Sequence, residues 1–242
     1  MINLKENKIF YDPYPHALFT NVFENEFYNK LCDEFPEEIK FDRFDYDKQN
    51  NLKQKKFVLN DNNALFTEII KKKPNLNLLY KFLSSQKFKN IIFELLENNS
   101  IKIQKTHSKT VFKRIYNKLK NKKDFGFEFS MISTNGGFIK PHTDGADKLI
   151  SFVMPIVENN NISKIPNSGT NILQTNDNKY KYNLLNSTVP FELTEVVREI
   201  PFDKNQIFLF VKTHNSLHSV GPMENMSENN LMRKSINFFI YK

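Results

Sequence analysis

Hydrophobic residues change their spacing near the middle of this chain. In the first half they recur every three or four positions, which is the spacing of one face of a helix. Pro36 ends the first such stretch and Pro74 separates the next two, because proline interrupts a helix. A short extended piece is expected near 17–19. The predicted helices cover 22–35, 63–73, 75–98 and 110–122.

From Phe125 the hydrophobic residues recur at every second position, which is the spacing of a β-strand with two different faces. Phe127, Phe129 and Met131 share one face of the first strand, and Glu128 lies on the other. A turn is predicted where Asn and two glycines follow each other at 135–137. The predicted strands cover 125–132, 148–156, 171–174, 191–195, 206–211 and 234–241.

These elements predict a mainly β (α+β) protein with a single domain over 1–242. Residues 1–124 would be mostly helical support and residues 125–242 would form the β core. No Pro-, Gly- or Ser-rich linker separates the halves, and no internal repeat is visible. The chain has 24 phenylalanines and no tryptophan, so we expect a core built on phenylalanine rings. The polar loops 157–168 and 176–190 are the expected places for substrate contacts.

Charge and cysteine content bear on partners and compartment. Lys and Arg number 35 against 27 Asp and Glu, a net charge of +8. A basic stripe would indicate a nucleic-acid partner, but the lysines are scattered among asparagines, so we favour a role in solubility. The single cysteine, Cys32, excludes internal disulfides and fits a reducing compartment. The chain shows no apolar leader and no apolar stretch of membrane-spanning length, so we expect a cytoplasmic protein without a membrane partner.

Residue types that bind metals occur in the second half at a spacing that suits chelation. His142 and Asp144 are two positions apart, so on an extended segment both side chains point to the same side and can hold one ion. A third ligand would come from His214 or His218, which follow the apolar run 207–211. Two imidazoles and one carboxylate leave open positions on an octahedral ion, as in non-haem Fe(II) oxygenases. A structural zinc site usually needs four ligands, commonly including cysteine, and is not favoured.

The last predicted strand offers a site for an organic acid. Arg233, Ser235 and Asn237 share one of its faces, opposite an apolar face. A guanidinium and a hydroxyl side by side form a fork for a carboxylate. A surface salt bridge at Arg233 is the alternative interpretation. His16 and His107 have no acidic or histidine partner at ligand spacing and are interpreted as ordinary polar histidines.

The order of these groups, His-x-Asp, a distal histidine and Arg-x-Ser, resembles the 2-oxoglutarate- and Fe(II)-dependent dioxygenases, in particular their prolyl-hydroxylase-like branch. The likeness covers about 125–242. It implies a double-stranded β-helix, a cupin-like jelly roll, with an N-terminal helical layer. It also selects His218, since the distal ligand is followed by a small residue, Val and then Pro, as in 218–222. Many members have a Tyr for the cosubstrate on the strand face where this chain has Phe127, Phe129 and Met131.

The resemblance also implies a reaction. The protein would hydroxylate a C–H bond of an unidentified small-molecule or peptidyl substrate, using O2 and 2-oxoglutarate and releasing succinate and CO2. Two alternatives stay open. One is a non-catalytic cupin-like module that binds a metal or ligand, and the other is a nucleic-acid-directed protein that uses the positive charge. The implied Fe(II) ligands are His142, Asp144 and His218, and the implied contacts to the distal carboxylate of 2-oxoglutarate are Arg233 and Ser235.

Overall fold

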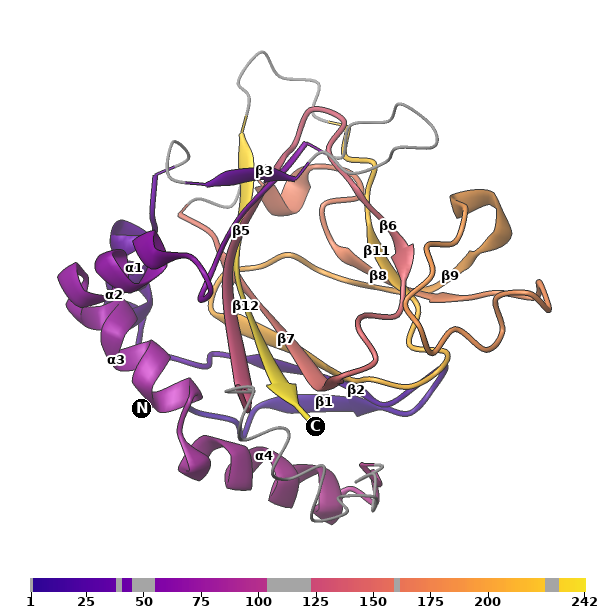
Figure 1. Cartoon of the computed structure of the whole chain (residues 1–242), viewed down its shortest axis with the longest axis horizontal. Coiled ribbons are helices and arrows are strands. Elements are labelled where there is room, and N and C mark those ends of the chain that lie inside the picture. Colours follow the sequence, from indigo (N-terminus) through magenta and orange to yellow (C-terminus); the bar gives the residue numbers. More distant parts are fainter. Residues whose placement is uncertain (1, 38–40, 45–54, 104–122, 159–161, 225–230) are drawn as a thin grey trace.

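Two antiparallel β-sheets lie face to face and form the body of the molecule (Figure 1). The structure, a computed structural model, describes residues 2–37, 41–44, 55–103, 123–158, 162–224 and 231–242. In this part of the chain the larger sheet has the strand order β1–β2–β10–β7–β12–β5–β4–β3, and the smaller sheet has the order β6–β11–β8–β9. The strands of the larger sheet are β1 (Asn7–Phe10), β2 (His16–Thr20), β3 (Asp42–Phe44), β4 (Lys56–Asn60), β5 (Phe125–Ser133), β7 (Lys148–Ile156), β10 (Gln206–Val211) and β12 (Met232–Tyr241). The strands of the smaller sheet are β6 (Ile139–His142), β8 (Thr170–Gln174), β9 (Glu195–Ile200) and β11 (His218–Val220).

The eight strands from β5 onward have the connections of a jelly roll. The chain alternates between the sheets except at β8 and β9, which follow each other in the smaller one. The larger sheet has β5, β7, β10 and β12, and the smaller sheet has β6, β8, β9 and β11. This arrangement confirms the predicted double-stranded β-helix. The first half adds two strands at each edge of the larger sheet, β1–β2 beside β10 and β4–β3 beside β5. Of these, only β2 coincides with an extended piece that the sequence had indicated.

The neighbouring strands β12 and β5 each have an apolar face and a mixed face. Across β12 and β5, Phe238 pairs with Phe127 and both are buried in the main hydrophobic core. In the adjacent register Asn237 pairs with Glu128, and both line a cavity between the sheets. The alternation predicted from the sequence therefore separates the core from the cavity wall.

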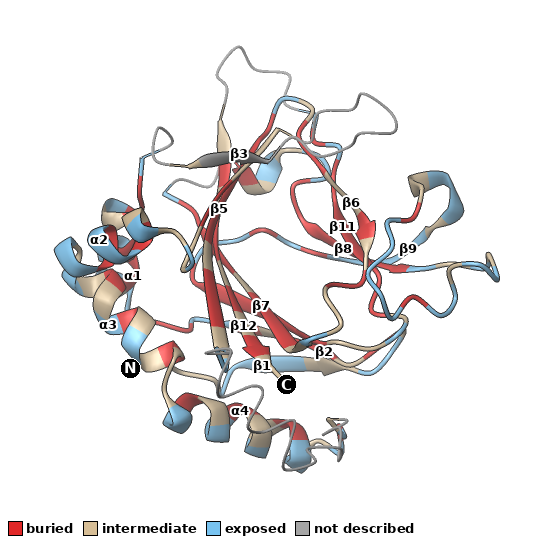
Figure 2. Cartoon of the chain, viewed as in Figure 1, coloured by how far each residue is buried: buried red, intermediate tan, exposed pale blue. Residues whose placement is uncertain are grey.

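Within the described residues, four helices pack against the outer face of the larger sheet, away from the smaller sheet (Figure 1). Figure 2 shows that their buried residues lie on the side that faces the strands. Phe66 contacts Phe127 with a ring-centroid distance of 5.6 Å, and Phe88 contacts Phe238 at 5.7 Å. The core is thus built on phenylalanine rings, as predicted. The helices are α1 (Asn25–Glu34), α2 (Ala64–Lys72), α3 (Pro74–Leu83) and α4 (Gln86–Asn98).

Two predicted elements were wrong in detail. The single helix expected over 75–98 is two helices, because Ser84 and Ser85 separate them and Ser85 caps α4 by accepting a hydrogen bond from the Phe88 backbone N–H at 3.2 Å. The strand expected over 191–195 is a short 3₁₀ turn, and β9 begins only at Glu195. Since the first five residues of β9 are exposed, hydrophobic alternation could not reveal it.

Two further expectations concern helices. The helix predicted over 110–122 lies outside the described residues. Among the helices that the structure describes, none is both long enough and apolar enough to cross a membrane.

The phenylalanine core yields a stability prediction. The ring of Phe238 is buried among the rings of four other phenylalanines, so Phe238→Ala should lower the free energy of unfolding by about 3–5 kcal/mol. The control is Leu185→Ala, at a side chain that is 82% exposed, which should change it by no more than about 0.5 kcal/mol. Urea unfolding followed by circular dichroism measures both. Equal losses in the two variants would contradict the assignment of the core.

Candidate metal centre and its cavity

Two short strands of the smaller sheet bring the predicted metal-binding side chains together. His142 ends β6 and His218 begins β11, and the two residues are direct partners across the antiparallel pair. Asp144 follows in the connection from β6 to β7, with φ at +71°. One ligand atom of each residue lies within 4.8 Å of the other two. The structure therefore brings together the three side chains that the sequence analysis named.

The hydrogen bonds of the two imidazoles leave the same ring nitrogen free on each. Nδ1 of His142 lies 2.8 Å from the Lys140 carbonyl, and Nδ1 of His218 lies 3.0 Å from the Ser216 carbonyl. Because a carbonyl can only accept, each Nδ1 carries the proton and each Nε2 keeps a lone pair. Burial, together with the neighbouring His142, lowers the pKa of His218 to about 3. His218 is therefore neutral at physiological pH, which is the form that binds a metal.

The carboxylate of Asp144 is gripped at both oxygens. Ser151 Oγ donates to Oδ2 at 2.6 Å, and Lys148 Nζ lies 3.0 Å from Oδ1. His142 Nε2 is 3.6 Å from the same Oδ1. Burial by itself would raise the pKa of Asp144, but Lys148 and the two histidines outweigh it and hold the pKa well below its usual value. The group is therefore an ionised carboxylate, ready to bind a cation.

Arg233 supplies a buried positive charge in the same cavity. It is only 2% exposed, and its Nε donates to the Ser168 carbonyl at 2.7 Å. A terminal nitrogen lies 3.2 Å from Thr170 Oγ1, and the guanidinium carbon lies 3.9 Å from the ring centroid of Phe202. Burial lowers the pKa of Arg233 to about 9. No carboxylate of the described residues pairs with it, so the surface salt bridge considered from the sequence is not formed there.

Ser235, the second predicted contact to the organic acid, also lines the cavity. Its hydroxyl lies 3.1 Å from Oδ1 of Asn237, two residues further along the strand. Nδ2 of Asn237 donates in turn to Oε1 of Glu128 at 3.0 Å, and Lys56 Nζ lies 3.3 Å from the same oxygen. A continuous polar strip therefore runs along β12, β5 and β4 on the cavity side.

The cavity wall contains residues that the sequence interpretation missed. Glu128 and Ser130 are the cavity-facing residues of β5, whereas Phe127, Phe129 and Met131 belong to the core on the other face. The face on which many members of the resembling family have a Tyr for the cosubstrate therefore lies in the hydrophobic core of this protein and does not line the cavity. Period-two spacing separated the two faces correctly, but nothing in it told which face turns inward. Lys56, Lys148 and Ser151 were also missed.

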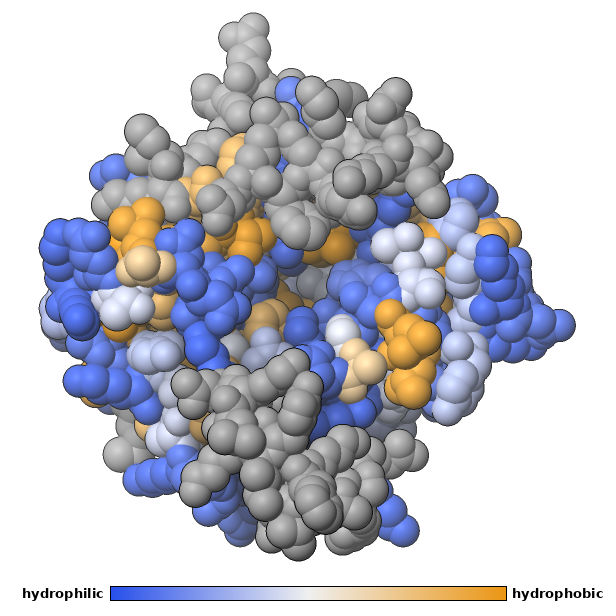
Figure 3. All heavy atoms as spheres, in the orientation of Figure 1, coloured by the Kyte–Doolittle hydropathy of each residue, from blue (hydrophilic) through white to orange (hydrophobic). Residues whose placement is uncertain are grey.

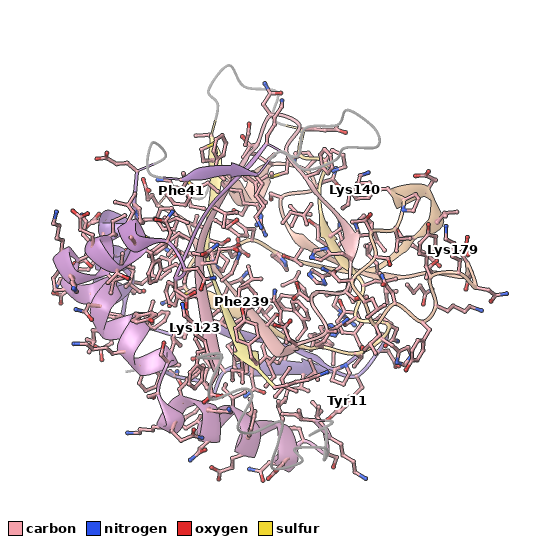
Figure 4. The ribbon with its side chains drawn as sticks, in the orientation of Figure 1. Tyr11, Phe41, Lys123, Lys140, Lys179 and Phe239 are labelled. Atoms are coloured by element: carbon pink, nitrogen blue, oxygen red, sulfur yellow. The ribbon has the colours of Figure 1, made fainter. Side chains whose placement is uncertain are left out.

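The opening of the cavity lies between the two sheets. The molecular surface in Figure 3 is mainly hydrophilic and is hollowed near the centre of this view. Phe239 of β12 lies close to that centre and lines the cavity, while Lys140 lies on β6 on the other side (Figure 4). Lys148 Nζ is 3.5 Å from the ring centroid of Phe239. The rim next to the three metal-binding side chains is thus basic and partly aromatic.

The remaining histidines lie elsewhere. His214 stacks on Tyr182 with a ring-centroid distance of 4.6 Å and is not part of the metal-binding group found among the described residues. His16 is buried, with Nδ1 2.8 Å from the Tyr14 carbonyl. His107 lies outside the described residues.

Comparisons with known proteins give only distant likenesses. No family model matches the sequence, and no curated protein matches it. Among solved structures the chain is similar to a prolyl-4-hydroxylase of Pseudomonas putida, with a TM-score of 0.44, 11% identity and coverage of 94% of this chain and 92% of that chain. A prolyl 4-hydroxylase structure from Phytophthora capsici is similar with a TM-score of 0.45 and 12% identity, and the match covers 93% of this chain and 58% of that chain. The non-haem alpha-ketoglutarate-dependent epimerase SnoN of nogalamycin biosynthesis is similar with a TM-score of 0.49 and 9% identity, and the match covers 93% of this chain and 76% of that chain. The chemistry of the cavity therefore has to indicate the function.

The geometry separates the two candidate distal histidines experimentally. His218→Ala removes one of three ligand atoms that lie within 4.8 Å of one another, so it should abolish tight binding of one Fe(II) per chain. His214→Ala should keep Fe(II) binding, because His214 stacks on Tyr182 instead. Anaerobic titration with Fe(II) against a chromophoric chelator measures both affinities. Loss of binding in His214→Ala alone would move the ligand to that residue.

Proposed function

We propose that the protein is an Fe(II)- and 2-oxoglutarate-dependent dioxygenase that hydroxylates a C–H bond of a small-molecule or peptidyl substrate, with release of succinate and CO2. One observation carries the proposal. His142, Asp144 and His218 line the same cavity as Arg233, a buried guanidinium without a carboxylate partner among the described residues. A metal site with open positions lies beside a buried cation that has no carboxylate partner among the described residues. This pair suits a cosubstrate that chelates the metal at one end and is anionic at the other.

The donor set fits Fe(II). Two imidazole nitrogens and one carboxylate oxygen form a 2-His-1-carboxylate set, which leaves three positions of an octahedral ion open. A structural zinc site would need a fourth ligand, usually a thiolate, and the only cysteine of the chain, Cys32, is buried in the hydrophobic core between α1 and the sheet. The metal group found among the described residues therefore matches an open, reactive site.

The position of Arg233 fits the far carboxylate of the cosubstrate. Its contacts with Ser168 and Thr170 hold the planar guanidinium in place before any ligand arrives. A carboxylate that binds two of its nitrogens would neutralise a charge that burial now destabilises. Ser235 stands next on the same face of β12 and can turn its hydroxyl from Asn237 to the ligand.

The roles of the chain follow from these contacts. When bound, the iron and 2-oxoglutarate supply the oxidising chemistry, through activation of O2 and oxidative decarboxylation of the 2-oxo acid. The protein contributes ligand orientation through Lys140 and Ser216, anchoring through Arg233, and an apolar wall that includes Val153 and Phe210 and limits the access of water. Lys148 and Phe239 stand at the rim, where a substrate would enter.

Succinate formation tests the reaction directly. The protein, incubated with Fe(II), 2-oxoglutarate and O2, should release succinate slowly even without its substrate, and Asp144→Ala should not. A metal-loaded protein that binds 2-oxoglutarate but releases no succinate, also with a panel of amino acids and peptides, would indicate the cupin-like binding module instead. Salt-dependent binding of a nucleic acid, without succinate release, would indicate the nucleic-acid-directed protein instead.

The anchor for the cosubstrate yields a separate prediction. Arg233→Ala should weaken 2-oxoglutarate binding roughly thirtyfold or more, because removing one member of a buried charge pair costs about 2–5 kcal/mol and about 1.4 kcal/mol corresponds to a factor of ten. Its metal affinity should stay near that of the unaltered protein. The matched control is Lys234→Ala, since Lys234 points to the other face and pairs with Glu158 at 2.6 Å. Calorimetric titration with Mn(II) in place of iron measures all three, and equal affinities would contradict the assignment of 2-oxoglutarate.

A further inference from the structure

The contact between Ser151 and Asp144 joins the two halves of the metal centre. Ser151 lies on β7 in the larger sheet, whereas the two histidines lie on the smaller sheet. Its hydroxyl donates to Oδ2 of Asp144 at 2.6 Å, and both residues are buried. A hydrogen bond of this length to an ionised carboxylate is charge-assisted and belongs to the stronger class.

The backbone of Asp144 is not paired in either sheet. It lies in the connection between β6 and β7, not in a strand, and its φ of +71° is in the left-handed region that non-glycine residues rarely adopt. Ser151, in contrast, lies on a central strand and pairs with Phe210 of β10 on one side and Phe239 of β12 on the other. The hydrogen bond from Ser151 therefore ties the carboxylate of Asp144 to a central strand of the larger sheet.

The two oxygens of Asp144 have different surroundings. Oδ1 lies 3.6 Å from Nε2 of His142, the nitrogen of that ring with no backbone carbonyl partner. Oδ2 is engaged by the hydroxyl of Ser151. Lys148 cannot set this orientation in the metal-bound protein, because its ammonium lies on Oδ1 and has the same sign of charge as the metal.

We propose that Ser151 is a positioning residue. By its hydrogen bond it keeps Oδ2 of Asp144 away from the metal, so that Asp144 binds the metal through Oδ1 alone. The inference rests on the metal site of the proposed function and adds a determinant outside the ligand set. One-oxygen binding leaves three of six octahedral positions open, whereas binding through both oxygens would leave two. A chelating 2-oxo acid fills two positions, so the position that Ser151 keeps open is the one that O2 would need.

The test compares Ser151→Ala with two further variants. Removing an outer hydrogen-bond partner of a metal ligand typically weakens metal binding about 10- to 100-fold, so Ser151→Ala should lose that much Fe(II) affinity. Ser151→Thr keeps the hydroxyl on a residue type that suits a strand and should restore the affinity to within a few-fold. Ser130→Ala is the matched control, because Ser130 is an equally buried serine of the cavity wall without a contact to Asp144, and its Fe(II) affinity should be unchanged.

Two measurements separate positioning from general damage to the fold. Urea unfolding of the metal-free proteins shows whether each variant is folded, and anaerobic Fe(II) titration gives the affinity. Equal Fe(II) affinity of Ser151→Ala and the unaltered protein would overturn the inference, and so would a folded Ser151→Thr that binds as weakly as Ser151→Ala. Failure of the unaltered protein to bind Fe(II) would instead overturn the proposed function, and the inference with it.

The dependence of succinate formation on O2 provides a readout that a purely structural role would not change. With Fe(II) and 2-oxoglutarate at concentrations that saturate each variant, Ser151→Ala should need a several-fold higher O2 concentration for half-maximal succinate formation, because Asp144 can then occupy the position that O2 requires. Ser151→Thr should show the O2 dependence of the unaltered protein. An unchanged O2 dependence in metal-saturated Ser151→Ala would contradict the one-oxygen role.

Discussion

The backbone pairing of β12 is the constraint on which the rest of the structure depends. Over most of its length β12 pairs with β5 on one side and with β7 on the other. Its side chains alternate, so Phe238 enters the core while Arg233 and Ser235 enter the cavity. A register shift of one residue would exchange the two faces and bury the guanidinium against the helices. The phenylalanine core that stabilises the sheet is therefore also what keeps Arg233 pointing into the cavity.

Charge inside the sandwich is expensive, and this chain keeps several charged groups there. Asp144 is stabilised by Ser151 and Lys148, and Glu128 by Asn237 and Lys56. Arg233 differs, since carbonyl, hydroxyl and ring contacts hold it without a carboxylate among the described residues. A buried charge in this condition lowers the stability of the folded protein by itself and gains most when an anion binds. An anion bound beside Arg233 would therefore stabilise the folded protein.

The imidazoles and the carboxylate of the candidate metal centre are oriented in two different ways. The imidazoles are held by backbone carbonyls next to them in the chain, so their tautomers follow from local geometry. The carboxylate of Asp144 stands on a connection between strands and takes its orientation from Ser151 on the facing sheet. The histidine tautomers therefore depend on contacts with residues two positions away in the chain, whereas the orientation of the carboxylate depends on a strand of the other sheet. Its integrity depends on the correct packing of the two sheets against each other.

The sequence by itself determined the periodic elements and the identity of the reactive groups. Period-two spacing and, for β10, a continuous apolar run located β5, β7, β10 and β12 to within two residues. The order His-x-Asp, His, Arg-x-Ser indicated which side chains lie together. The spacing did not locate β6 and β11, since strands of three or four residues are too short for a period to be seen. These strands became recognisable only through their pairing with each other.

Tertiary structure alone decided which face of β5 turns inward and which residue holds Asp144. Alternation assigns Phe127 and Glu128 to different faces, but the choice between the faces depends on where the helices of the first half pack. Lys56 reaches the cavity only because β4 is added beside β5. Ser151 meets Asp144 because two sheets fold over each other, and neither spacing nor residue type announces that contact. Local patterns report the chemistry available in each segment, whereas the contacts between sheets arise from packing between segments that are distant in the chain.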